Sequence, residues 1–238
     1  MKKKCTAIVL SAGVGKRMGS NLQKQYIEID NKPIIYYTLK TFQNSDIIDR
    51  IVMVVGKGDI ENVRETIVEA YQFSKVERIV EGGRERYDSV WNGLLAIRED
   101  KENGIPCDYV FIHDGARPFA DGKILERGYH AVERYGACVA GVPSKDTVKI
   151  ADDNGFAKET PPRKMVWTIQ TPQIFREALI HEAYQKLQTV PHEQVTDDAM
   201  VVESMTGASV KLFEGSYRNM KITTPEDLLV AEVFLKNC

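Results

Sequence analysis

Short apolar runs alternate with amphipathic stretches along most of the chain. The apolar runs are rich in Val and Ile and predict strands, whereas the stretches between them carry apolar residues at helical spacing. The predicted strands are residues 5–10, 50–55, 76–80, 109–113 and 137–142. The predicted helices are residues 33–43, 60–71, 86–97 and 122–135. Such alternation builds right-handed βαβ units, so we expect an α/β, Rossmann-like, mostly parallel sheet with helices on both faces.

The alternation breaks between residues 143 and 171. A turn at residues 152–155 and the pair Pro161-Pro162 indicate a hairpin in place of a further βαβ unit. Because the segment contains few apolar residues, we expect it to project from a single domain of residues 1–238 as a dimerisation arm, with a plain surface excursion as the alternative. Beyond it the pattern predicts helices at 176–188 and 197–205, a strand at 209–213, and a last helix that Thr224 caps.

The composition is that of an ordinary globular chain, with 43% hydrophobic and 28% charged residues. A net charge of -2 favours neither a nucleic acid nor a membrane as partner. No apolar run approaches the ~20 residues that span a bilayer, and the basic start at Met1 leads into a predicted strand, not a signal peptide. We therefore expect a cytoplasmic protein. No two of its cysteines form a C-x-x-C pair, so neither a disulfide framework nor a cysteine metal site is expected.

A glycine-rich loop follows the first predicted strand and reads Ser11-Ala12-Gly13-Val14-Gly15-Lys16-Arg17-Met18. Glycines let backbone N–H groups approach phosphate oxygens closely. The dinucleotide fingerprint would place glycine at Met18, and the P-loop would need Ser or Thr where Arg17 follows Lys16. Neither pattern fits. The loop is therefore a different phosphate-binding loop, which carries Arg17 and is followed by Lys24.

Paired cations after such a loop suit nucleotidyl transfer. Attack on an α-phosphate concentrates negative charge on its oxygens and on the leaving pyrophosphate, and fixed cations lower that barrier. The alternative is that Arg17 and Lys24 are solvated loop charges. Asp114 follows a predicted strand and either helps to hold Mg²⁺ or caps a turn. Asp197 and Asp198 favour a helix cap, and His113 a structural role.

Further motifs follow in order along the chain, and together with the loop they resemble the 2-C-methyl-D-erythritol 4-phosphate cytidylyltransferase family of the non-mevalonate isoprenoid pathway. Single motifs are weak, but the set covers residues 5–235 and is specific. The chain departs from the family pattern at Ser11, Arg84 and Gly115. The matching segments are residues 11–18, 24–26, 82–90, 113–118, 145–149, 170–173, 196–198, 219–223 and 225–228.

The resemblance implies transfer of CMP from CTP to 2-C-methyl-D-erythritol 4-phosphate, giving 4-diphosphocytidyl-2-C-methyl-D-erythritol and pyrophosphate. It also implies Mg²⁺ as cofactor and a homodimer in which each arm completes the partner's site. The implied catalytic residues are Arg17, Lys24, Arg163 and Lys221. The implied nucleotide-binding residues are Ser11, Ala12, Gly13, Gly15, Gly83 and Ser89. The implied substrate-binding residues are Asp114, Arg117, Thr147 and Thr171, with Asp114 also the candidate metal ligand.

Two rival functions remain open at this point. A ribitol 5-phosphate cytidylyltransferase shares the fold and the motifs at 170–173 and 221–223, but residues 12–14 and 114–117 favour the methylerythritol phosphate. A nucleotide-binding module without catalysis would not need four cations around one point. An acceptor phosphate is already anionic and attacks without losing a proton, so the cations are expected to bring two anions together.

Overall fold

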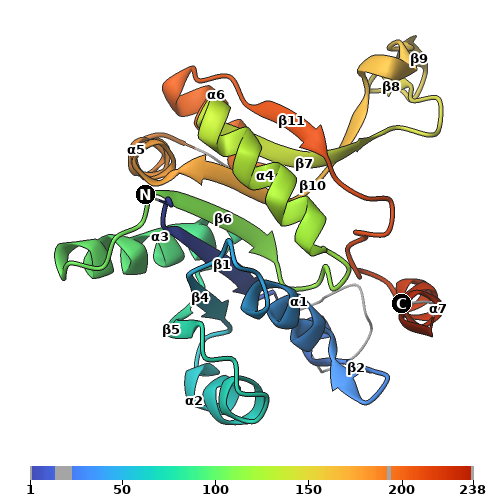
Figure 1. Cartoon of the computed structure of the whole chain (residues 1–238). Coiled ribbons are helices and arrows are strands. Elements are labelled where there is room, and N and C mark those ends of the chain that lie inside the picture. The colour runs from blue at the N-terminus through green and yellow to red at the C-terminus, as the bar shows by residue number, and fades with distance from the viewer. Residues whose placement is uncertain (1, 14–22, 192–193, 237–238) are drawn as a thin grey trace.

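The computed structural model describes residues 2–13, 23–191 and 194–236. Its centre is a sheet of seven strands (Figure 1). The strands are β1 (Cys5–Ser11), β4 (Arg50–Val55), β5 (Val76–Glu81), β6 (Tyr109–Asp114), β7 (Ala137–Pro143), β10 (Trp167–Arg176) and β11 (Lys211–Glu214). They lie in the order β11-β7-β10-β6-β1-β4-β5. The expected α/β fold with a mostly parallel sheet is confirmed.

Strand β10 is the one antiparallel member of this described sheet and lies between β6 and β7. Its first residues, Trp167 to Ile169, pair with β7, although the sequence pattern assigned them to the arm. The expectation that the arm extends to residue 171 was therefore wrong at its second boundary. Gln170, Thr171 and Gln173 are polar yet buried in the middle of this strand, so hydropathy gave no strand signal there.

The helices lie close to their predicted positions, and one of them, α4, matches the predicted bounds. The segment predicted as one helix at 60–71 instead begins as α2 and continues as a π-helical stretch over Arg64–Glu69. The helices are α1 (Ile34–Gln43), α2 (Ile60–Val63), α3 (Arg86–Glu102), α4 (Gly122–Tyr135), α5 (Glu177–Leu187), α6 (Asp198–Thr206) and α7 (Pro225–Lys236).

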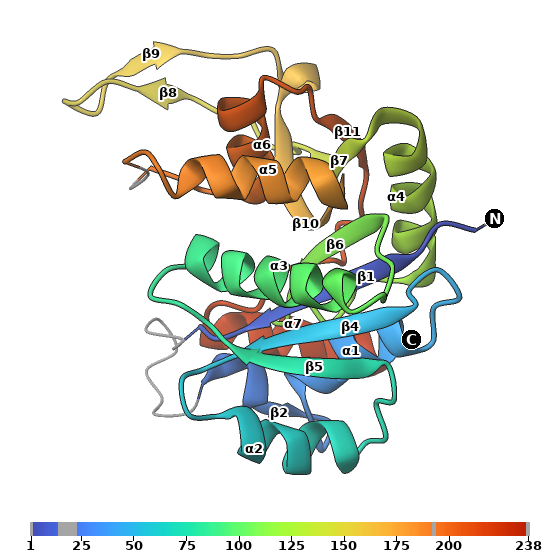
Figure 2. The same cartoon turned by 90° about the vertical axis from the view of Figure 1, so that its left-hand side faces the viewer.

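Helices cover both faces of the sheet because strand residues are buried on both sides (Figure 2). On one face Ala7 and Val9 of β1 belong to a core with α1, α2 and α4. On the other face Ile8 belongs to a core with α3, α5 and α6. Helix α7 packs separately, near the short hairpin of β2 (Glu28–Ile29) and β3 (Lys32–Pro33). No described helix is long and apolar enough to cross a membrane.

The arm leaves the body after β7 and carries a short hairpin of β8 (Ile150–Ala151) and β9 (Ala157–Glu159) (Figure 2). The carboxylate of Asp152 accepts backbone N–H groups from Asn154 and Phe156 and so closes the turn. Phe156 and Met165 are each 73% exposed, which leaves large apolar side chains without cover in the single chain. The projecting segment is residues 144–166, because Trp167 pairs with β7 and returns the chain to the central sheet.

Candidate active site

A cavity of about 400 Å³ opens where the parallel strands β1, β5 and β6 end. Ligands bind at this edge in open α/β sheets, because the loops after the strands meet there. The strands contribute the residues that follow them, α3 contributes its first turn, and a short 3-10 helix, η2 (Lys24–Tyr26), contributes Lys24. The lining residues are Leu10, Ala12, Gly13, Lys24, Gln25, Gly83, Arg84, Glu85, Arg86, Ser89, Asp114, Ala116 and Lys221.

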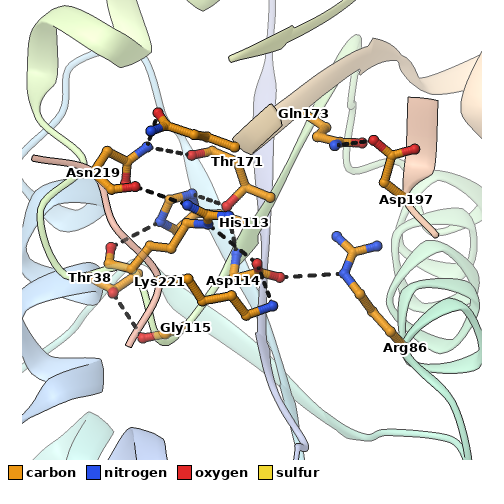
Figure 3. Close-up of polar contacts among 12 residues, drawn as sticks. Thr38, Arg86, His113, Asp114, Gly115, Thr171, Gln173, Asp197, Asn219 and Lys221 are labelled. Carbon is orange, nitrogen blue, oxygen red and sulfur yellow. Dashed lines mark hydrogen bonds and ion pairs between the residues drawn. The ribbon is translucent and has the colours of Figure 1, made fainter. Parts of the chain in front are cut away.

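Asp114 is the charged centre of this cavity and contacts three cations, of which Figure 3 labels Arg86 and Lys221. The Nζ of Lys221 lies 2.9 Å from Oδ2, the Nε of Arg117 lies 3.4 Å from Oδ2, and the Nε of Arg86 lies 3.4 Å from Oδ1. Burial alone would raise the pKa of Asp114, but the three cations outweigh it and hold the pKa well below its usual value. The carboxylate is therefore ionised at neutral pH and is the common partner of these three cations. The alternative that Asp114 only caps a turn does not account for these contacts.

Arg86 joins this centre to helix α6 through Asp198. Its two terminal nitrogens donate to the two carboxylate oxygens of Asp198, at 2.9 and 2.8 Å. Asp198 is fully buried and also accepts a 2.6 Å hydrogen bond from the hydroxyl of Tyr184. Burial disfavours the charged guanidinium, but Asp198 and Asp114 outweigh this and raise the pKa of Arg86 well above its usual value. Asp197 alone takes the expected helix-cap role, accepting a backbone N–H from the first turn of α6.

His113 and Thr171 form a hydrogen-bonded layer behind Asp114. The backbone N–H of Asp114 donates to Thr171 Oγ1 at 3.1 Å, which leaves the hydroxyl hydrogen to donate to His113 Nδ1 at 3.0 Å. His113 Nε2 then donates to the carbonyl of Arg117 at 3.2 Å. This assignment of the hydrogens requires a neutral imidazole. Burial supplies it, because it lowers the pKa of His113 to about 4.

Asn219 connects the same layer to the loop that carries Lys221. It is fully buried, and its Nδ2 donates to the carbonyl of Thr171 at 2.8 Å. Its backbone carbonyl accepts a 2.9 Å hydrogen bond from the guanidinium of Arg117. Arg117, Thr171 and Lys221 therefore come from distant parts of the chain but share one hydrogen-bonded framework.

Lowering the pH from 7 to 5 is expected to reduce the free energy of unfolding by about 2 kcal/mol through His113 alone. The pKa of the imidazole is about 4 in the folded chain against 6.5 for the free side chain. The unfolded chain therefore takes up the proton first, so the contribution is complete above pH 6.5 and is lost progressively as the pH falls from 6.5 to about 4. Urea titrations at both pH values, on the wild type and on His113→Gln, measure this loss. An equal pH dependence of the two proteins would contradict it.

The structure brings most of the residues singled out in the sequence to one place. Ala12, Gly13, Lys24, Gly83, Ser89, Asp114 and Lys221 line the cavity. Arg117 and Thr171 contact Asp114, and Ser11 is buried and does not line the cavity, with its hydroxyl 3.1 Å from that of Tyr26. Gly15 and Arg17 lie outside the described residues.

The two remaining residues are on the arm and do not line the cavity. Thr147 and Arg163 are exposed, and the guanidinium of Arg163 donates to the carbonyl of Lys145 at 3.2 Å. Within the described part of one chain, therefore, the cationic cluster forms without Arg163. The sequence had given no role to Arg86 or Asn219, although both lie inside the quoted motifs. Two sequence features could have pointed to them. Arg86 is a charged residue at the start of the helix after a strand, and Asn219 is a polar residue two positions before Lys221.

The described residues contain no group of three or more His, Cys, Asp or Glu side chains that could hold a metal ion. Asp114 already shares its charge with three cations, so it can give Mg²⁺ only part of the ligand set. Mg²⁺ accepts such an arrangement when substrate phosphates and water supply the other oxygens.

A mostly parallel sheet with a glycine-lined, cationic cavity beyond its strand ends suits a nucleotidyltransferase. The chain belongs to the 2-C-methyl-D-erythritol 4-phosphate cytidylyltransferase family, whose family model matches residues 5–237. The rival readings, a ribitol 5-phosphate enzyme and a module without catalysis, are not favoured by this result.

Similar proteins cover the chain almost completely. The cytidylyltransferase of Alkaliphilus oremlandii is 48% identical over 98% of this chain and 95% of its own. The enzyme of Lachnoclostridium phytofermentans is 47% identical over 98% and 97%. Among solved structures, the 4-diphosphocytidyl-2C-methyl-D-erythritol synthase of Anaerococcus prevotii superposes with a TM-score of 0.85 at 35% identity, covering 99% of this chain and 97% of that one.

Proposed function

We propose that the cavity around Asp114 is the place where the two substrates of this enzyme meet. The chain transfers CMP from CTP to 2-C-methyl-D-erythritol 4-phosphate and releases pyrophosphate, as its family does. The observation that carries the location is the convergence of Lys24, Lys221 and the open backbone of Ala12 and Gly13 on one cavity. A glycine-lined wall takes phosphate oxygens, and the two lysines supply the positive charge that two anionic substrates require.

In the proposed mechanism, a phosphate oxygen of the acceptor attacks the α-phosphorus of CTP. The new P–O bond forms as the bond to the β-phosphate oxygen breaks, and pyrophosphate leaves with the electron pair. Since the attacking oxygen is already anionic, no side chain has to remove a proton. Lys24 and Arg17 stabilise the charge that develops on the transferred and leaving groups.

Lys221 is proposed to position the acceptor phosphate. Its Nζ is held 2.9 Å from Asp114, and its side chain is 35% exposed at the cavity wall. When an incoming phosphate takes this ammonium group, Arg86 and Arg117 still balance the charge of Asp114. The buried carboxylate therefore never stands without a cation. When bound, Mg²⁺ would neutralise triphosphate charge, with Asp114 as the candidate ligand that the sequence singled out.

Pyrophosphate release tests this function directly. Purified protein with CTP and Mg²⁺ is expected to release pyrophosphate with 2-C-methyl-D-erythritol 4-phosphate and not with ribitol 5-phosphate. Release with ribitol 5-phosphate alone would keep the chemistry and overturn the acceptor. No release with either compound would leave only nucleotide binding. The cytoplasmic location expected from the sequence stays a prediction.

We further propose that the arm completes the active site of a second subunit. Arg163 and Thr147 are exposed on the arm and do not line the cavity of their own chain, and the large apolar side chains of Phe156 and Met165 are open for contact. A closed exchange of arms between two copies would bury these side chains and would give each cavity an additional arginine.

Mixed dimers are expected to recover activity that each variant lacks. Arg163→Ala and Lys24→Ala are each expected to lose about a hundredfold in rate, since each removes a cation aimed at phosphate. Mixed dimers obtained by co-expression of the two variants should show about half of the wild-type activity, because each mixed dimer contains one intact shared site. Pyrophosphate release after co-purification through two different tags measures this recovery. A mixture no more active than its components would contradict arm exchange.

A further inference from the structure

Lys24 lies in a short helix that buried amide groups attach to the end of strand β1. Gln25 is only 2% exposed. Its Nε2 donates one hydrogen to the carbonyl of Ser11 and the other to Oε1 of Gln23, at 2.7 Å. Tyr26, the residue after Gln25, adds a second attachment, because its hydroxyl lies 3.1 Å from that of Ser11. Both hydrogens of the Gln25 amide are therefore used to hold the backbone that carries Lys24.

The chain of amides ends on Asp59, in the turn after strand β4. Gln23 Nε2 donates to Asp59 Oδ2 at 2.6 Å. Asp59 stands at the first position before α2, where an aspartate usually accepts an N–H from the helix. Its side chain makes no such cap hydrogen bond here. The carboxylate is directed to Gln23 in place of its own helix.

The turn leaves little room around this contact. A Cβ on Gly56 would meet Asp59 Oδ2 and would lie 2.9 Å from Gln23 Nε2. Only glycine fits there without moving the contact. The Asp59 end of the path is therefore closely packed.

An ionised carboxylate can only accept hydrogen bonds, and this sets the orientation of both amides. Gln23 must turn its NH₂ group to Asp59, so its carbonyl oxygen faces Gln25. Gln25 must then present its own NH₂ group to Gln23 and to Ser11. One charged group outside the cavity thereby determines the hydrogen bonds on both sides of Lys24.

We propose that Asp59 is a positioning residue for the transfer reaction and acts through Gln23 and Gln25 on the place of Lys24. Asp59 does not line the cavity. The proposal rests on the role given to Lys24 above. It assigns a part in the reaction to a turn that no motif or resemblance singled out.

Asp59→Ala is expected to lower kcat about tenfold and to change the KM for CTP by much less, because a displaced Lys24 is missed mainly in the transition state. Asp59→Asn still offers an acceptor oxygen to Gln23 but no longer forces its orientation, so its kcat is expected to lie between those of Asp59→Ala and the wild type. Glu61→Ala removes an exposed carboxylate in α2, two residues after Asp59, and serves as the matched control. Its kcat is expected to be unchanged. If Asp59→Ala does not fold, Gln23→Met breaks the same path at its centre and is expected to show the same loss.

A double-mutant cycle separates positioning from a general loss of structure. In a Lys24→Ala background, Asp59→Ala is expected to cause no further fall in kcat, because the side chain that it positions is gone. The same tenfold fall in both backgrounds, or a wild-type kcat in Asp59→Ala, would overturn the proposal. The role of Lys24 is judged separately, since wild-type kcat in Lys24→Ala alone would remove the proposed mechanism itself.

Discussion

Replacing Lys24 by alanine is expected to lower kcat about a hundredfold or more, with a small change in the KM for CTP. The transferred α-phosphate gains charge only in the transition state, so an ammonium group aimed at it contributes little to binding of the ground state. A hundredfold loss corresponds to about 2.7 kcal/mol of transition-state stabilisation. Pyrophosphate release at saturating CTP and acceptor gives kcat, and a CTP titration gives KM.

Lys123→Ala is the matched control for this experiment, because Lys123 is exposed at the start of α4 and does not line the cavity. It is expected to keep the wild-type kcat and KM. A Lys24→Ala variant with unchanged kcat and raised KM would assign Lys24 to nucleotide binding alone. The charge that develops on the phosphates in the transition state would then be stabilised by the other cations.

Arg86→Met is expected to reduce the free energy of unfolding by about 3–5 kcal/mol. The substitution leaves the carboxylate of Asp198 fully buried with Tyr184 as its remaining hydrogen-bond donor. Asp198→Asn is expected to cost less, because the Arg86 side chain is 29% exposed and can turn its charge to cavity water and to Asp114. Urea denaturation at pH 7 compares the two variants with the wild type.

The double variant Arg86→Met with Asp198→Asn checks the reason for this asymmetry. If the unpaired buried charge causes the loss, removing the carboxylate as well is expected to recover part of the stability lost in Arg86→Met. Equal destabilisation by the two single variants, or a double variant with the sum of both losses, would show that packing and not charge decides the cost.

Much of the sheet could be predicted because its parallel strands are continuous apolar runs. Strands β1 and β4 and helix α4 lie almost where the pattern placed them, since hydrophobic periodicity reports burial directly. Strand β10 was missed because Gln170, Thr171 and Gln173 are buried through hydrogen bonds and not through hydrophobicity. A pattern based on hydropathy does not detect burial of this kind.

The same limit applies to the candidate site. Lys24, Asp114 and Lys221 belong to motifs and were found from the sequence, and the structure places all three at one cavity. Arg86 and Asp198 carry no less charge but were not recognised as partners, because they are 112 residues apart. No local spacing rule connects two residues at that distance.

The sequence by itself determined the α/β class, the order of most elements and the loop motifs, because these depend on local patterns of burial and backbone conformation. The tertiary structure alone decided which charges meet. Asp114 gains Arg86 and Lys221, Asp198 its arginine and Gln23 its carboxylate only when distant loops converge at the ends of the parallel strands. Short-range electrostatics in a buried environment depends on that convergence, and the linear order of residues does not contain it.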